Sequence, residues 1–163
     1  MLKYFPYISI FYFLFVNFAF AETVTLKSNT IVVVKSIEEV TTQKYKPGQE
    51  VIFSVGADVK VKGKVVIESG AKVIGIVQSS EEEQMAGVAG KISVAVQVVE
   101  TIDGQDIPIS GQYLYEGDSE VGGTVAVGVL LCPLVLLNKG KPGTIPVGAQ
   151  IRALTVGTTE VEI

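Results

Sequence analysis

The chain has 163 residues and a formal net charge of −4, from 13 basic and 17 acidic side chains, and it contains no histidine. Such a chain offers no basic stripe of the kind that phosphate backbones require, so nucleic acid is not an expected partner. The lack of histidine removes the commonest general base and the commonest metal ligand, so we expect no enzymatic activity, cofactor or metal site. A single cysteine cannot form an internal disulfide, and the fold must therefore rest on packing.

The N-terminus has the pattern of a secretory signal peptide. Lys3 provides a short basic region, residues 4–21 carry no charge, and Ala19-Phe20-Ala21 precedes Glu22. This order predicts export and cleavage after Ala21, which leaves residues 22–163 as one domain. An uncleaved anchor is the alternative, because the uncharged run lies near the lower limit of about 17 residues for a span. We expect the mature protein in the periplasm, at the outer membrane, or outside the cell.

The rest of the chain predicts an all-β fold. Short runs of Val, Ile and Thr are broken by Gly, Asn, Pro or charged pairs, with no sustained helical period. Lys62-Gly63 and Asp103-Gly104 supply turn chemistry, since glycine accepts the positive φ that a hairpin requires. The expected strands are residues 23–26, 30–37, 50–55, 59–61, 64–67, 72–78, 90–101, 107–115, 149–154 and 159–163.

Residues 79–87 are the one helix candidate. Ser79 stands three residues before Glu82, as in a capping box, and Gly87 is a typical stop signal. The segment is too short to be stable alone, so an acidic loop is the alternative.

A weak internal repeat relates residues 67–75 to residues 145–153. Both have the pattern Ile-x-x-Gly-Ala-x-(Val/Ile). Each copy predicts a tight turn, at Gly70 or Gly148, that leads into an alternating strand, as when two strands enter a barrel at the same rim. Chance similarity is the alternative, because two copies fall short of a repeat array.

Five short segments occur in an order that resembles a known family. They are residues 47–51, 63–67, 70–75, 103–109 and 144–148. Together they resemble exported bacterial β-barrel proteins and, more distantly, the C-terminal barrel domain of the TrbI-type scaffold proteins of type IV secretion systems. The resemblance covers roughly residues 46–155 and implies a small β-barrel of short strands, with one apolar insert between the last hairpins.

The departures from this family are substantial. In the scaffold proteins, a helical hairpin that inserts into the outer membrane lies between the Asp-Gly hairpin and the last Ile-Pro-x-Gly strand. Here that interval contains a much shorter apolar run, and Glu68 stands where a proline is usual. The chain also lacks the cytoplasmic, inner-membrane and Pro-rich spacer segments. The resemblance therefore implies the barrel fold but not a complete channel subunit.

The apolar run at residues 121–137 is the strongest functional signal. Its 17 residues carry no charge, and as a helix it would be about 25 Å long, short of the roughly 30 Å hydrocarbon core. Glycines and Pro133 interrupt it, so we do not expect it to span a membrane. It either packs in the core or docks on a membrane surface, a partner or another copy. The candidate docking residues are Val129, Leu130, Leu131, Leu134, Leu136 and Leu137.

Two acidic clusters could in principle attract a divalent cation. Consecutive side chains such as Glu81–Glu83 cannot all face one ion in regular structure, which favours a solvated run. Asp103 and Asp106, with Glu100 nearby, lack the spacing of a calcium loop, and a turn role already explains Asp103.

The possible nucleophiles also have a plainer interpretation. Cys132 has no neighbouring base or cation to lower its pKa, which predicts a small apolar filler. Ser110 and Ser119 have no base partner identifiable from the sequence. Tyr113 and Tyr115 are two residues apart and predict one face of a strand.

Two functions follow from these features. The first is a non-enzymatic structural or interaction module of the bacterial cell envelope, which docks through the apolar insert on an envelope protein, a second copy or the membrane surface. The second is a barrel that binds a lipid or small apolar ligand, with the insert as a lid.

Overall fold

The computed structural model describes residues 22–85, 88–117 and 139–163, which form twelve strands and no helix. None of these residues therefore belongs to a helix that is long and apolar enough to cross a membrane. The strands are β1 (Thr23–Leu26), β2 (Ile31–Ser36), β3 (Val40–Thr41), β4 (Glu50–Val55), β5 (Val59–Val61), β6 (Lys64–Ile67), β7 (Lys72–Glu81), β8 (Lys91–Glu100), β9 (Asp106–Glu116), β10 (Thr144–Ile145), β11 (Gln150–Thr155) and β12 (Thr159–Glu162).

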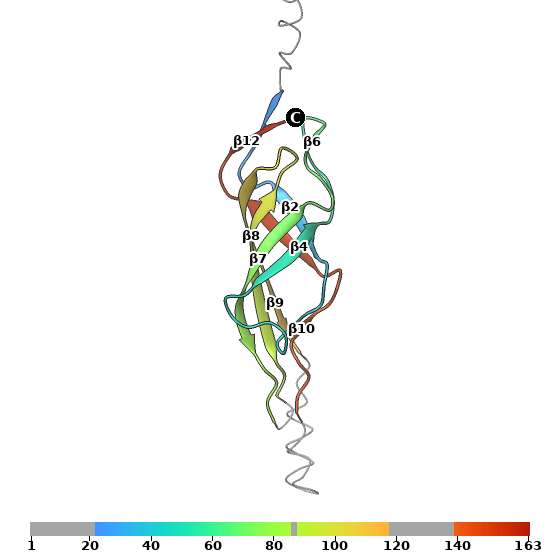
Figure 1. Cartoon of the computed structure of the whole chain (residues 1–163), viewed down its shortest axis with the longest axis vertical. Helices are drawn as coiled ribbons and strands as arrows, with labels where there is room; N and C mark the ends of the chain where they lie inside the picture. The colour runs from blue at the N-terminus through green and yellow to red at the C-terminus, as the bar shows by residue number, and fades with distance from the viewer. Residues whose placement is uncertain (1–21, 86–87, 118–138) are drawn as a thin grey trace, which may run out of the picture.

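Six antiparallel strands close into a barrel, in the order β11-β2-β4-β7-β8-β9 (Figure 1). The barrel closes where β9 returns to β11, through the pairs Leu154↔Ser110 and Thr155↔Ile109. Closure leaves none of these six strands with a free edge, so their backbone groups are paired on both sides. The prediction of an all-β small barrel is confirmed.

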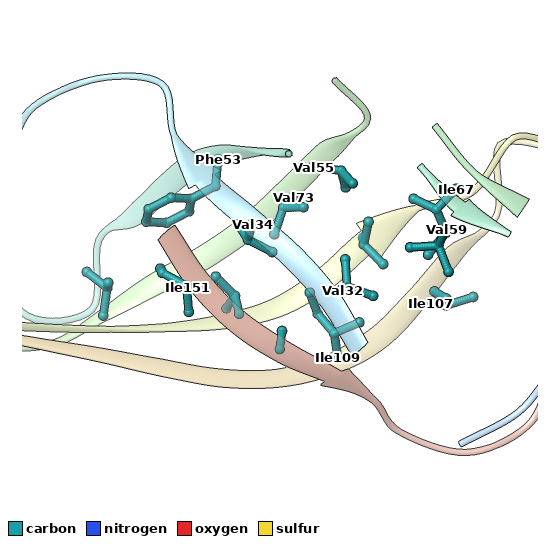
Figure 2. Close-up of a cluster of buried hydrophobic side chains, with 14 of the residues drawn as sticks. Val32, Val34, Phe53, Val55, Val59, Ile67, Val73, Ile107, Ile109 and Ile151 are labelled. Carbon is teal, nitrogen blue, oxygen red and sulfur yellow. The ribbon is translucent and has the colours of Figure 1, made fainter. Parts of the chain in front are cut away.

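Strict alternation along the strands fills the barrel interior. β4 exposes Glu50 and Ile52 but buries Val51, Phe53 and Val55, as expected for a strand whose successive side chains point to opposite faces. β2 and β11 alternate in the same way. Figure 2 shows aliphatic side chains from these strands gathered beside the Phe53 ring. The interior is therefore a packed hydrophobic core.

Small residues make room for the Phe53 ring, the largest of the fully buried side chains. A Cβ atom on Gly75 of β7 would lie 2.9 Å from Phe53 Cε2 and 2.9 Å from the Ala95 carbonyl oxygen. Where the barrel closes, β9 lies beside β11, and a Cβ on Gly111 of β9 would lie 2.9 Å from the Cα of Ala153 on β11. Both glycines are thus required by close packing, because a six-stranded barrel has a narrow interior.

Three two-stranded units extend the barrel at its ends. β1 pairs with β12 and β5 pairs with β6 at the end where β12 and β6 lie in Figure 1, while β3 pairs with β10 at the other. Val59 and Ile67 of the β5–β6 hairpin are buried, and Figure 2 shows them beside Ile107 of β9. These side chains cover one end of the core.

The predicted strands are confirmed, and four of them have the predicted bounds: β1, β4, β5 and β6. The two-residue strands β3 and β10 were missed, because pairs this short carry no periodicity. Of the two alternatives for residues 79–87, the helix is wrong for the described residues 79–85. β7 continues to Glu81, which pairs with Lys91, so the ladder with β8 overrides the local capping signal. Residues 82–84 have no regular structure, and residues 86–87 lie outside the described part.

The predicted turns at Gly70 and Gly148 are confirmed, and Gly48 forms a third turn of the same kind. The three glycines have φ values of 92°, 83° and 85°, respectively. In each turn, the residue after the glycine donates its N–H to the carbonyl three residues earlier in the chain, at 3.1–3.2 Å, as in a type II turn. Each turn leads into a barrel strand, and these strands are β7, β11 and β4.

The three turns also dock on the barrel in the same way. In each turn, the glycine donates its N–H to the carbonyl of one residue on the adjacent strand. The N–H of that strand residue in turn donates to the carbonyl of the residue after the glycine. The strand residues are Val77, Val55 and Ser36, with distances of 2.7–3.0 Å. The internal repeat therefore has a third copy at residues 46–49, which the sequence pattern missed because its Ile and Ala are absent.

We expect Gly70→Ala to lower the free energy of unfolding by about 1–2 kcal/mol, because a left-handed conformation costs an alanine that much. No heavy atom lies within 4 Å of a Cβ at this position, so backbone strain is the whole cost. Gly70→Asn is the matched control, and we expect a smaller loss because asparagine tolerates positive φ. Urea denaturation of both variants would measure this, and equal losses would contradict the strain argument.

Candidate functional site

The structure describes the two places where the apolar segment joins the barrel. The predicted docking residues lie outside the described residues, as do Cys132 and Ser119. They are Val129, Leu130, Leu131, Leu134, Leu136 and Leu137. On either side of the segment, the described chain ends at Gly117 and resumes at Lys139.

Both flanks of the segment are hydrogen-bonded to one residue, Gly90, which directly precedes β8. Gly117 donates its N–H to the Gly90 carbonyl at 3.1 Å, and Gly90 donates its N–H to the Lys141 carbonyl at 2.9 Å. These residues are termed the neck: Gly90, Gly117 and residues 139–143. The neck brings the described residues on the two sides of the apolar segment to a single place on the barrel.

In the neck, the chain segments pack with their backbones in direct contact at glycines. A Cβ on Gly90 would lie 2.7 Å from the Gly143 nitrogen, and one on Gly143 would lie 2.9 Å from the Gly90 carbonyl. A Cβ on Gly117 would lie 3.1 Å from the Lys141 oxygen, and one on Gly140 would collide with the Val88 carbonyl. Only glycine allows these chain segments to come so close.

The β7–β8 connection braces the neck. Gly140 donates its N–H to the Gln84 carbonyl at 3.0 Å, and Gln84 donates its own N–H to the Val88 carbonyl at 3.0 Å. Met85 forms an isolated antiparallel bridge with Lys139. Further along, Thr42 donates its N–H to the Gly143 carbonyl at 3.0 Å, which links the neck to the β3–β10 pair.

The acidic run at residues 81–83 ties this connection to the segment after β3. Glu82 forms an ion pair with Lys46, and Gln43 donates from Nε2 to Glu83 Oε1 at 3.0 Å. The bond from Gln43 and the backbone N–H of Glu83 itself lower the pKa of Glu83, with smaller contributions from Lys139 and Lys46. Across the described residues, no group of three acidic or sulfur ligands could hold a metal ion.

One ion pair closes the barrel side of the neck. Lys91 at the start of β8 lies 3.0 Å from the Glu116 carboxylate at the end of β9, directly opposite in the strand register. The hydrogen bond to Glu116 raises the pKa of Lys91. Both side chains are largely exposed, so the pair contributes orientation more than stability.

Asp103 has the turn role that the sequence predicts, in the β8–β9 hairpin. Its carboxylate accepts bonds from Thr101 Oγ1 at 2.5 Å, Gln105 Nε2 at 2.5 Å, the Gln105 N–H at 3.2 Å and the Glu162 N–H at 3.0 Å. Partial burial raises the pKa of Asp103, but these bonds outweigh it and leave the pKa below its ordinary value. The carboxylate thus joins the hairpin to β12.

The remaining candidates lie on β8 and β9 and do not converge. Glu100 and Asp106 face each other in the register beside this hairpin and are exposed. Ser110 points outward from the barrel. Tyr113 and Tyr115 are half-buried against the core on the inner face of β9, which confirms their assignment to one face of a strand.

The comparisons with known proteins concern the shape of the chain. No protein-family model matches it, and a search of curated proteins finds no match. Among solved structures, it is similar to ComB10 of the Com type IV secretion system of Helicobacter pylori, with a TM-score of 0.45 and 15% identity. The match covers 82% of this chain and 88% of that one. The barrel itself is established by the strand pairing of this chain.

We expect Gly143→Ala to loosen the neck and to cost about 1–3 kcal/mol, as overpacking usually does. The neighbouring atoms are backbone atoms of Gly90 and Lys91, which cannot rotate away. Gly56→Ala is the matched control, because its new Cβ meets only the flexible Lys35 side chain. Hydrogen exchange should accelerate at residues 84–91 and 139–143 in the first variant alone. Unchanged exchange there would contradict the role of the neck.

We expect Asp103→Asn to lower the free energy of unfolding by about 1–3 kcal/mol at neutral pH, because it replaces an accepting oxygen with a donor. A group with a lowered folded pKa stabilises the fold above its ordinary value, 3.8, and this contribution is lost as pH falls through the folded pKa. The two proteins should therefore converge in stability in acid. Thermal melts between neutral pH and pH about 2 would measure the difference in stability between the wild type and the variant. A difference that stays constant with pH would contradict a stabilising role of the ionised carboxylate.

Proposed function

We propose that this protein is a non-enzymatic structural or interaction module of the bacterial cell envelope, which docks through the apolar segment at residues 121–137. The barrel serves as the rigid scaffold, and the neck presents the segment to a partner. The single observation that carries this proposal is that the barrel interior is already filled by the protein's own side chains.

The filled interior weighs against the ligand-binding alternative. A barrel of about eight strands is only just wide enough to hold a small ligand, and this barrel has six. Val32, Val34 and Phe53 point into it and are fully buried. A lid over such a core would have no cavity to enclose. The filled interior therefore favours binding through a surface outside the barrel.

The neck supports a docking role for the segment. The described residues on its two sides, Gly117 and Lys141, are both hydrogen-bonded to Gly90. The segment carries no charge, unlike the alternating strands, which favours apolar surroundings on both of its faces. An envelope protein or a second copy of this chain is the preferred partner, and the membrane surface is the remaining one.

Export forms part of the proposal. The basic, apolar and small-residue pattern of residues 1–21 supports a signal peptide that is removed after Ala21. The sequence resemblance to the barrel of type IV secretion scaffolds also supports an envelope location and protein–protein interaction.

We expect the triple variant Leu131→Ser, Leu134→Gln, Leu136→Ser to lose association while its melting temperature stays nearly unchanged. A docking surface contributes to binding, whereas core leucines would each cost several kcal/mol if replaced. Sedimentation velocity at several concentrations and crosslinking in envelope preparations would measure self-association and partner capture.

Leu114→Ser is the matched control, because Leu114 is 65% exposed on the outer face of β9 and lies outside the segment. We expect it to change neither association nor stability. The proposal would be contradicted if the wild type showed no measurable association and the triple variant unfolded. That result would assign the segment to packing in the core.

A further inference from the structure

A basic groove lies at the end of the molecule opposite the neck. It has a volume of about 620 Å³ and runs between the end of β1, the start of β2 and the β5–β6 hairpin. Its charged lining residues are all lysines. The lining consists of Thr25, Lys27, Thr30, Lys60, Val61 and Lys62. A basic groove is unexpected on a chain whose net charge is negative.

Both walls of the groove contain a residue in the left-handed conformation. Asn29 has φ 61° in the β1–β2 turn, and Lys62 has φ 52° at the tip of the β5–β6 hairpin. They are the two non-glycine residues with positive φ in the described part of the chain. Asparagine is common in this conformation, but lysine is not, and the turn at Lys62-Gly63 would favour Asn-Gly. Non-glycine residues held in this conformation cluster at functional sites, which makes Lys62 a candidate functional residue.

The wall that contains Lys27 is fixed by hydrogen bonds. The Lys27 carbonyl accepts the hydroxyl of Thr30 at 2.7 Å and the hydroxyl of Thr155 at 2.8 Å. On the other wall, Val59 is buried and anchors the hairpin that carries Lys60 and Lys62. The groove therefore exists before any ligand binds, which lowers the entropic cost of binding.

Neighbouring acids neutralise the groove only weakly. Asp58 lies 3.8 Å from Lys60 Nζ, but its other oxygen accepts the Ser69 N–H at 2.9 Å. Glu160 of β12 is opposite Thr25 in the strand register. Neither acid lines the groove, so the charged residues that line it are three lysines.

We propose that this groove binds a phosphate-bearing anion. Three lysines match a multiply charged oxyanion better than a single carboxylate, and the lysine ammonium is a common point-charge partner of phosphate. The volume falls within the range of about 300–1,000 Å³ for small-molecule sites, so there is room for the group that carries the phosphate. A soluble phosphate compound and a lipid headgroup offer the same chemistry.

Two binding assays on the mature protein test this site. Isothermal titration calorimetry with inorganic pyrophosphate at low salt measures binding of the free anion. Flotation with vesicles of equal parts phosphatidylcholine and phosphatidylglycerol, with pure phosphatidylcholine as the reference, measures binding of the headgroup. Salt should weaken the interaction in either assay.

Lys62→Asn is the decisive variant, because it removes the charge while placing a residue that the left-handed turn favours. We expect affinity to fall about tenfold, as for loss of one charge-assisted hydrogen bond, while the melting temperature stays equal or rises. Lys27→Gln should weaken binding similarly. Lys72→Gln is the matched control, since Lys72 is exposed on β7 and does not line this groove.

Pyrophosphate binding that is weakened in the two groove variants but not in Lys72→Gln would support the site with a soluble anion as ligand. The same pattern in the vesicle assay alone would support it with a lipid headgroup as ligand. Lack of binding in both assays, or equal weakening by Lys72→Gln, would overturn the proposal.

Discussion

The structure depends on closing six strands around one aromatic ring. Phe53 fills the interior of the barrel, and Gly75 removes the side chain that would otherwise occupy the same space. At Gly111 and Ala153, small residues let two neighbouring strands approach. In the described part of the chain, the interior of this narrow barrel is thus occupied by the protein's own side chains.

Three equivalent turns set the strands of this barrel in register. Gly48, Gly70 and Gly148 each introduce a strand with the same pair of hydrogen bonds to its neighbour. A reused turn is an economical way to enforce pairing, because its geometry fixes which residue faces which across the ladder. The added two-stranded units then extend the barrel and leave two different ends.

The two ends have different chemistry. At one end, the glycine-rich neck gathers the flanks of an uncharged segment at Gly90, which suits apolar docking. At the other, Lys27, Lys60 and Lys62 line a groove that suits an anion. A rigid barrel between them would separate an apolar contact from an electrostatic one, so that each could be altered without disturbing the other.

The sequence by itself determined the strands other than β3 and β10, because the alternation of Val and Ile with polar residues is a local property with a period of two. It also identified the turns at Gly70, Gly148 and Asp103-Gly104, and the apolar segment by its lack of charge. Tertiary structure decided the rest. The capping signal at Ser79 yielded to pairing with β8, and Gly90 meets Gly143 only through long-range packing. Lys27 and Lys62 are far apart in sequence, and only the folded chain brings them to one groove.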